Sequence, residues 1–257
     1  MIGFLLAPPM AWAASDPFPQ VAAAYLVEVN GAPLWQKQAD KRLPPASLTK
    51  LMTALLVFET SNPRDVATVT PDAEHETGTR LGLKAGEKYL VRDLLAATLI
   101  HSANDACHVL MDHAAGSERK FVSLMNRRAA EWGLADTHFA NGCGHDEAGH
   151  YSTASDLARL AKLAMQNRAI LGMASITELQ IDEVGGHHHF DIINSNALIG
   201  RYPGVIGLKT GFTPRAGKCL IAYAERGGTH VLLVMLNAPN RWWDASDILD
   251  ISFAHVR

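Results

Sequence analysis

Three short segments of this chain carry side chains that together could perform covalent catalysis. They are Ser47-Leu48-Thr49-Lys50, Ser102-Ala103-Asn104 and Lys209-Thr210-Gly211, in that order. Each segment alone is uninformative, since S-x-x-K is most often an ordinary helix start and K-T-G an ordinary turn. Together they offer a serine nucleophile, a lysine base, a second polar pair and a cationic strand, which indicates acyl transfer from an amide.

Ser47 is the predicted nucleophile and Lys50 its general base. An unassisted serine hydroxyl is a poor nucleophile, so it needs a neighbouring base. Lys50 lies three residues later, one helical turn away on the same face. A lysine acts as a base only when neutral, and burial or a second cation such as Lys209 would lower its pKa.

The other two segments are predicted to move protons and to bind substrate. Ser102 can relay a proton to a leaving amine, while the Asn104 amide can bind a peptide carbonyl and hold a lysine. Either residue could instead simply cap the helix that follows. Lys209 would supply positive charge, Thr210 a hydroxyl for a substrate carboxylate, and Gly211 room for a close backbone approach on an edge strand.

An oxyanion hole is predicted beside the nucleophile. Ser47 lies at a helix start, where backbone N–H groups are free and the helix dipole is positive. The N–H groups of Ser47 and Phe212 would then point at a developing oxyanion. One such donor is worth about 3–4 kcal/mol of transition-state stabilisation.

The elements that position these segments follow from hydrophobic patterning. Strands are expected at 22–29 and 34–38 around an Asn30-Gly31 turn, and a helix from Ser47. A mostly helical stretch follows at about 63–175, with helices at 91–98, 105–113, 121–132 and 155–166 and a loop at 141–150. Strands return at 179–181, 189–193, 220–224 and 231–236, before a final helix at 242–253.

This order predicts an α+β fold: an antiparallel sheet flanked by helices, with a mainly helical subdomain inserted. The chain has 257 residues and is 48% hydrophobic, enough for one domain at 20–257 with a helical lobe at about 63–175. The net charge is −3 and the basic residues are scattered, which argues against nucleic acid as a partner.

The first thirteen residues resemble an export signal. They are apolar and end in Ala11-Trp12-Ala13, a small-x-small cleavage pattern, but they lack a basic start. We expect residues 1–13 to be part of a signal peptide, and the protein to be periplasmic or secreted. The alternative, a buried N-terminal strand or helix, is disfavoured by Pro8-Pro9.

The cysteines and histidines do not indicate a metal site. Cys107, Cys143 and Cys219 are an odd number, so at least one is unpaired within the chain, and their pairing stays open. His187-His188-His189 would alternate between the two faces of a strand and make a poor chelate. We therefore expect neither a metal nor a cofactor.

With these segments the chain resembles the low-molecular-mass penicillin-binding proteins, the family of serine D-alanyl-D-alanine carboxypeptidases and endopeptidases. The resemblance runs from about Ala22 to Phe253 and includes the local sequences at 45–54, 102–106, 149–154 and 194–198. It implies a β-lactamase/transpeptidase-like fold and an acyl-enzyme. It also implies peptidoglycan stem peptides ending in D-Ala-D-Ala as substrates, and β-lactam antibiotics as covalent inhibitors.

The resemblance also implies roles for residues outside the three segments. Arg241 falls where the family has an arginine near the substrate's terminal carboxylate. Phe212 stands where carboxypeptidases of the family often have histidine and endopeptidases phenylalanine, and Ser195 where some members have arginine. Removal of a terminal D-Ala is therefore expected, with cleavage of cross-links as the alternative. Because the chain ends at Arg257, we expect no C-terminal membrane anchor.

Two other functions compete with that of a peptidase. A class A β-lactamase deacylates through a glutamate, but residues 136–141 contain no E-x-x-L-N, and Glu147 lacks the partner asparagine. A non-catalytic muropeptide-binding scaffold would not need the complete set of reactive side chains.

Overall fold

The computed structural model describes residues 16–255, so the expected export signal at 1–13 lies outside the described residues. The strands are β1 (Ala24–Val29), β2 (Ala32–Lys37), β3 (Val66–Thr68), β4 (Lys88–Leu90), β5 (Glu178–Asp182), β6 (His189–Ile193), β7 (Val205–Thr213), β8 (Gly217–Arg226) and β9 (Thr229–Leu236). The helices are η1 (Ala46–Thr49), α1 (Lys50–Thr60), α2 (Pro71–Glu74), α3 (Val91–Ala96), η2 (Ala97–His101), α4 (Asn104–Ala115), α5 (Glu118–Glu131), α6 (Ala154–Gln166), α7 (Arg168–Ala174) and α8 (Arg241–His255).

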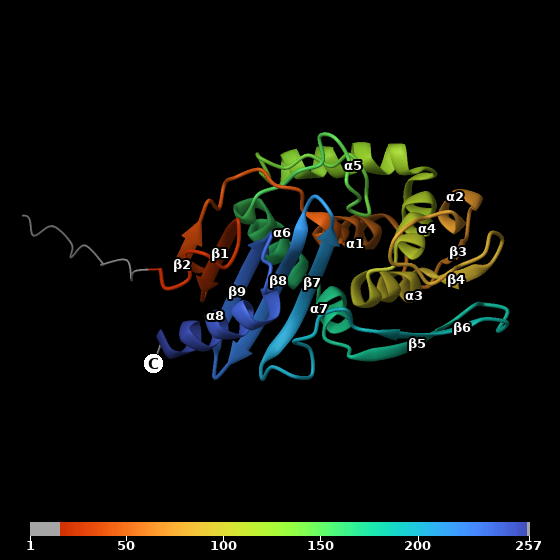
Figure 1. Ribbon diagram of the computed structural model, residues 1–257. Coiled ribbons are helices and arrows are strands. Elements are labelled where there is room, and N and C mark those ends of the chain that lie inside the picture. Colours follow the sequence, from red (N-terminus) through yellow and green to blue (C-terminus); the bar gives the residue numbers. More distant parts are fainter. Residues whose placement is uncertain (1–15, 256–257) are drawn as a thin grey trace, which may run out of the picture.

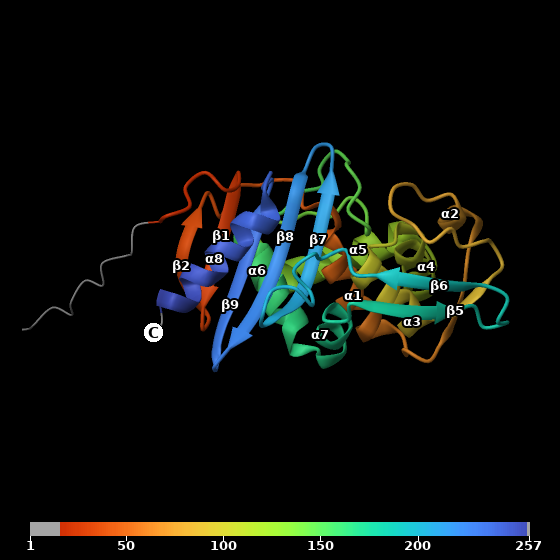
Figure 2. The same cartoon turned by 60° about the horizontal axis from the view of Figure 1, so that its bottom comes forward.

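A five-stranded antiparallel sheet forms the centre of the fold, in the order β2-β1-β9-β8-β7 (Figure 2). Alternate side chains of its strands enter two separate cores, as the period of two in a strand requires. On β9, Val234 and Leu236 pack toward the core that contains α1 and α6, whereas Leu233 and Met235 pack toward α8. The predicted α+β fold is therefore confirmed.

Helices α3 and α4 lie beside the β7 edge of this sheet, whereas α6 packs against one of its faces (Figure 1). Helix α1 is the central element of the helical part of the chain, and every residue from Lys50 to Val57 is buried. The predicted helix at Ser47 begins as the short 3₁₀-helix η1, and α-helical geometry starts only at Lys50. Helix α3 continues into a π-helical turn, η2, that leads directly to Ser102.

Several short elements were not predicted from the sequence. Strands β3 and β4 form a two-stranded sheet, and α2 and α7 are short helices. The predicted strands β5 and β6 pair only with each other, in a hairpin that extends away from the main sheet (Figure 2). Elements as short as these do not show a hydrophobic period from which they could be predicted. They form because tertiary contacts stabilise them.

Within residues 16–255, no helix has the length and apolar character needed to cross a lipid bilayer.

Candidate active site

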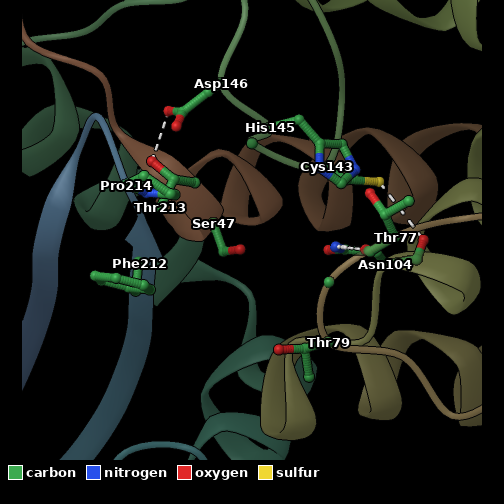
Figure 3. A pocket seen from close by; sticks show the side chains of 12 residues that line it. Ser47, Thr77, Thr79, Asn104, Cys143, His145, Asp146, Phe212, Thr213 and Pro214 are labelled. Atoms are coloured by element: carbon green, nitrogen blue, oxygen red, sulfur yellow. Dashed lines mark hydrogen bonds between the residues drawn. The ribbon is translucent and has the colours of Figure 1, made fainter.

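A pocket of about 540 Å³ opens between the β7 edge of the sheet and the helical part of the chain. Ser47 lies at its centre, with Phe212 on one side and Asn104 on the other (Figure 3). The pocket is lined by Ser47, Thr77, Gly78, Thr79, Asn104, Cys143, Gly144, His145, Asp146, Phe212, Thr213 and Pro214. The pocket thus brings together parts of all three sequence segments, or their direct neighbours.

The turn that carries Ser47 is held by a chain of hydrogen bonds. Ala46, just before it, has a left-handed φ of 48°, which costs free energy for a residue with a side chain. The Ala46 carbonyl accepts from Thr49 Oγ1 at 2.8 Å, and Thr49 Oγ1 lies 2.9 Å from His150 Nε2. Since His150 Nδ1 accepts from the Ala140 N–H, the neutral imidazole must carry its proton on Nε2 and donate to Thr49.

Burial keeps His150 in this neutral form, because it lowers the pKa of His150 to about 4. The sequence resemblance included His150 within the 149–154 segment but assigned it no role.

Two glycines allow the backbone to close around the nucleophile. A Cβ atom on Gly211 would lie 3.0 Å from Ser47 N and 3.0 Å from Ala46 Cβ. A Cβ atom on Gly144 would lie 2.1 Å from Ala46 O. Strand β7 and the 141–150 loop therefore approach the N–H group of Ser47 at distances that only glycine permits.

Lys50 is fully buried and directly contacts Ser47. Its Nζ lies 3.0 Å from Ser47 Oγ and 2.7 Å from Asn104 Oδ1, and it also donates to the carbonyl of Cys143. Burial lowers the pKa of Lys50 to about 7, although the charges of Glu76 and Asp105 oppose this shift. A substantial fraction of Lys50 is then neutral near pH 7 and able to accept the Ser47 proton.

Ser102 and Lys209 form a second hydroxyl–amine pair. Ser102 has a left-handed φ of 67° at the end of η2, and its Oγ accepts from Lys209 Nζ at 2.8 Å. Lys209 is 1% exposed, and its pKa is held well below the usual range by burial, then by the charges of Lys50 and Arg241. Of the two causes expected to lower the pKa of Lys50, burial or a second cation such as Lys209, burial has the largest effect.

Asn104 connects the base to the far wall of the pocket. Its Oδ1 accepts from Lys50, while its Nδ2 donates to the carbonyl of Thr77. Neither Ser102 nor Asn104 caps the following helix, whose N-cap residue is Ala103 and has no side-chain cap bond. The next residue, Asp105, accepts from three consecutive backbone N–H groups at 81–83 and so anchors the same wall.

The remaining predicted binding residues lie along β7 and α8. Thr210 Oγ1 is 2.8 Å from the Oγ of Ser195, which lies in the segment between β6 and β7. Phe212 is 62% exposed at the pocket rim. Arg241 is not among the pocket-lining residues; its Nη1 donates to the carbonyls of Gly211 at 2.6 Å and Cys219 at 3.1 Å.

A carboxylate with two histidine partners also borders the pocket, and no motif in the sequence indicated it. Glu76 Oε1 lies 2.7 Å from His108 Nδ1, and Glu76 Oε2 lies 2.9 Å from His145 Nε2. Burial raises the pKa of Glu76, but the hydrogen bonds and charges of both histidines outweigh it and hold the pKa at about 2. Glu76 therefore stays ionised and ties the 76–79 segment to α4 and to the 141–150 loop.

The structure corrects one detail of the argument against a β-lactamase. Asn141 Nδ2 donates to Glu147 Oε2 at 3.0 Å, so Glu147 does have a partner asparagine. Glu147 is nevertheless exposed and is not among the residues that line the pocket. The Oδ1 of Asn141 accepts from the N–H groups of Gly144 and His145, which indicates a role in shaping the loop.

The structure also shows the partners of the cysteines and of the histidines at 187–189. Cys107 and Cys143 form a disulfide, and Cys219 is a buried free thiol. His188 pairs with Glu87 and His189 with Asp182, both as exposed side chains. Among residues 16–255, no group of three or more His, Cys, Asp or Glu side chains is arranged to hold a metal ion.

Comparison with known proteins gives consistent matches over most of the chain. Residues 11–240 match the family model described as D-alanyl-D-alanine carboxypeptidase. The D-alanyl-D-alanine carboxypeptidase DacF of Bacillus subtilis is 35% identical over 244 residues, which cover 91% of this chain and 62% of that protein. The D-alanyl-D-alanine carboxypeptidase of Streptomyces sp. (strain K15) is 33% identical, covering 92% of this chain and 89% of that protein.

Solved structures agree with these sequence matches. The crystal structure of the Streptomyces K15 DD-transpeptidase superposes with a TM-score of 0.84 at 30% identity, covering 91% of this chain and 97% of that one. A penicillin-binding protein homologue from Mycobacterium tuberculosis gives a TM-score of 0.87 at 30% identity, covering 94% of this chain and 95% of that one.

Proposed function

Because the chain belongs to the D-alanyl-D-alanine carboxypeptidase family, we propose that it is a serine D,D-carboxypeptidase. Its substrates are peptidoglycan stem peptides ending in D-Ala-D-Ala, and β-lactam antibiotics acylate the same serine. The observation that carries this proposal is the 3.0 Å contact between Ser47 Oγ and the buried Nζ of Lys50. It pairs a hydroxyl with an amine whose burial favours the neutral, basic form.

The reaction follows from the two hydroxyl–amine pairs. Neutral Lys50 takes the proton of Ser47 as Oγ attacks the carbonyl of the penultimate D-Ala, and the N–H groups of Ser47 and Phe212 stabilise the oxyanion. The Ser102–Lys209 pair delivers a proton to the departing amine of the terminal D-Ala. Water then attacks the acyl carbonyl and gives its proton to the Ser102–Lys209 pair, while protonated Lys50 returns its proton to the departing Ser47 Oγ, which restores both groups and releases the shortened peptide.

A comparison of two substrates tests this proposal. The protein is incubated with a D-Ala-D-Ala pentapeptide and with a cross-linked dimeric muropeptide, and the products are identified by mass. We expect loss of one D-Ala from the pentapeptide. If penicillin labels the protein but neither substrate is cleaved, a muropeptide-binding scaffold is favoured instead. Rapid turnover of nitrocefin with slow peptide cleavage would indicate a β-lactamase.

We also propose that the protein is exported. The apolar segment at 1–13 supports this, with its small-x-small ending. The Cys107–Cys143 disulfide gives independent support, because disulfides persist mainly in oxidising compartments outside the cytosol.

Arg241 is proposed to recognise the free carboxylate at the substrate's end. Loss of a charge-assisted hydrogen bond should lower kcat/KM of Arg241→Ala for D-Ala-D-Ala peptides by about 10- to 150-fold. The variant also loses the bonds to the carbonyls of Gly211 and Cys219, so a general structural loss must be separated out. A peptide with an amidated end does this: carboxylate recognition predicts a smaller loss on that peptide, and equal losses on both would argue against it.

Cleavage of cross-links is the second candidate activity, and exposed Phe212 is the observation that favours it. Phe212 offers an apolar wall at the rim but no side-chain hydrogen bond. We expect Phe212→His to raise the ratio of pentapeptide trimming to cross-link cleavage, because a ring N–H could bind a free substrate end. Both rates are measured with one enzyme batch, and an unchanged ratio would place the preference elsewhere in the site.

A further inference from the structure

The Cys107–Cys143 disulfide joins the two elements that hold the proposed base. Nζ of Lys50 has three hydrogen-bond partners: Ser47 Oγ, Asn104 Oδ1 and the carbonyl of Cys143. Asn104 begins α4, and Cys107 lies one helical turn further along the same helix. Cys143 belongs to the 141–150 loop. The disulfide therefore connects the helix that supplies one acceptor to the residue that supplies the other.

The direction of the Cys143 carbonyl depends on contacts with other parts of the molecule. Cys143 lies between Gly142 and Gly144, and Gly144 has a φ of 86°. Glycine has the largest backbone freedom of any residue, so the direction of the Cys143 carbonyl depends on contacts made by side chains. The Gly144 N–H, in the same peptide unit as that carbonyl, donates to Asn141 Oδ1 at 2.8 Å, and the disulfide holds the Cys143 side chain from the other side. The Cys143 side chain is 1% exposed and is fixed by its bond to Cys107, which is fully buried in α4.

We propose that the Cys107–Cys143 disulfide is a positioning element for Lys50, which keeps the Cys143 carbonyl and the Asn104 amide at a fixed separation around Nζ. Without it the loop stays attached to the molecule, because Thr53 Oγ1 donates to the Gly142 carbonyl at 2.6 Å. What is lost is the alignment of the Lys50 amine with Ser47. This inference rests on the proposed function, since it assigns Lys50 the role of base.

Misalignment of Lys50 should be observable as a change in its pKa, which depends on the burial and the charges around its amine. Burial is the largest influence on the pKa of Lys50 and lowers it, while the charges of Glu76 and Asp105 raise it. The charge of Lys50 in turn lowers the pKa of its neighbours Lys209 and His150. If the Cys143 carbonyl is displaced, water from the pocket that Cys143 lines can reach the Lys50 amine. Water favours the charged amine, so the pKa of Lys50 should rise and acylation should require a higher pH.

The double variant Cys107→Ala/Cys143→Ala tests the proposal. Its second-order rate of acylation by a fluorescent penicillin is measured from pH 5.5 to pH 9.5, alongside the wild type. We expect a rate about 10- to 100-fold lower at neutral pH, because small misplacements of a catalytic group have effects of this size. The ascending limb of the pH profile should also move to higher pH.

Val109→Ala is the matched control. Val109 is fully buried on the same helix, so this variant loses stability without touching the disulfide. Val109→Ala should have a lower melting temperature, but the ascending part of its pH profile of acylation should lie at the same pH as that of the wild type. The proposal would be overturned if the ascending part of the double variant's pH profile coincides with that of the wild type and its acylation rate is within about twofold of the wild-type rate. If wild-type Ser47 is not acylated at all, the proposed function fails instead.

Reduction of the wild type gives a second test that needs no substitution. A dithiol reductant transfers two electrons and two protons to the disulfide, which becomes two thiols while the reductant becomes a cyclic disulfide. Alkylation and mass measurement confirm the reduced state. Reduced wild type should show the same slower rate and shifted limb, even if the double variant does not fold. Reduced protein with an unchanged profile would contradict the proposal.

Discussion

Replacing Ser47 by alanine is expected to abolish covalent labelling by penicillin and all release of D-Ala. The alanine side chain has no oxygen to form the ester, so no acyl-enzyme can accumulate. The fold should be retained, since Ser47 is half-buried and its side-chain bond in the structure is the one with Lys50 Nζ. Labelling is followed by gel fluorescence and by intact mass, and folding by the melting temperature.

Ser123→Ala is a suitable control for this experiment. Ser123 lies on the exposed face of α5 and donates only to the carbonyl of Arg119 one turn earlier. It should label at the wild-type rate. Penicillin attached to another serine of the Ser47→Ala variant would refute the assignment of the nucleophile.

Substituting Lys50 should give the second-largest effect, a fall in acylation rate of at least about 100-fold, the lower range for general acid–base catalysis. Lys50→Arg keeps a cation but cannot accept a proton, because a guanidinium stays protonated at any working pH. Lys50→Met has a similar shape without an amine, so it removes the base with little change in packing. Both variants should lose activity, although only one of them loses the charge.

The pH dependence of the wild type gives a related expectation with a definite sign. Burial lowers the pKa of Lys50 to about 7, and the reactive form is the neutral one. Acylation should therefore fall as pH drops below about 7 and reach a plateau above it. The exposed Lys120 on α5 provides a control, Lys120→Met, with unchanged rate and profile. Near-normal acylation by Lys50→Met would show that another group takes the proton.

The sequence by itself determined the parts of this protein that depend on local spacing. One helical turn separates Ser47 from Lys50, so their 3.0 Å contact needs little from the rest of the chain. The central strands could be predicted because their side chains alternate between two cores. The longer helices could be predicted because they carry an apolar stripe. The order of these elements then led to the correct fold class.

Only the tertiary structure decided the contacts between distant segments. The pairing of Cys107 with Cys143 and the bond from His150 to Thr49 join residues 36 and 101 positions apart, for which no local pattern exists. The burial of Lys50 belongs to the same class, because it depends on η1, α4 and the 141–150 loop meeting around one amine. Desolvation by these three elements lowers its pKa, so the chemistry of the lysine is a property of the packed fold.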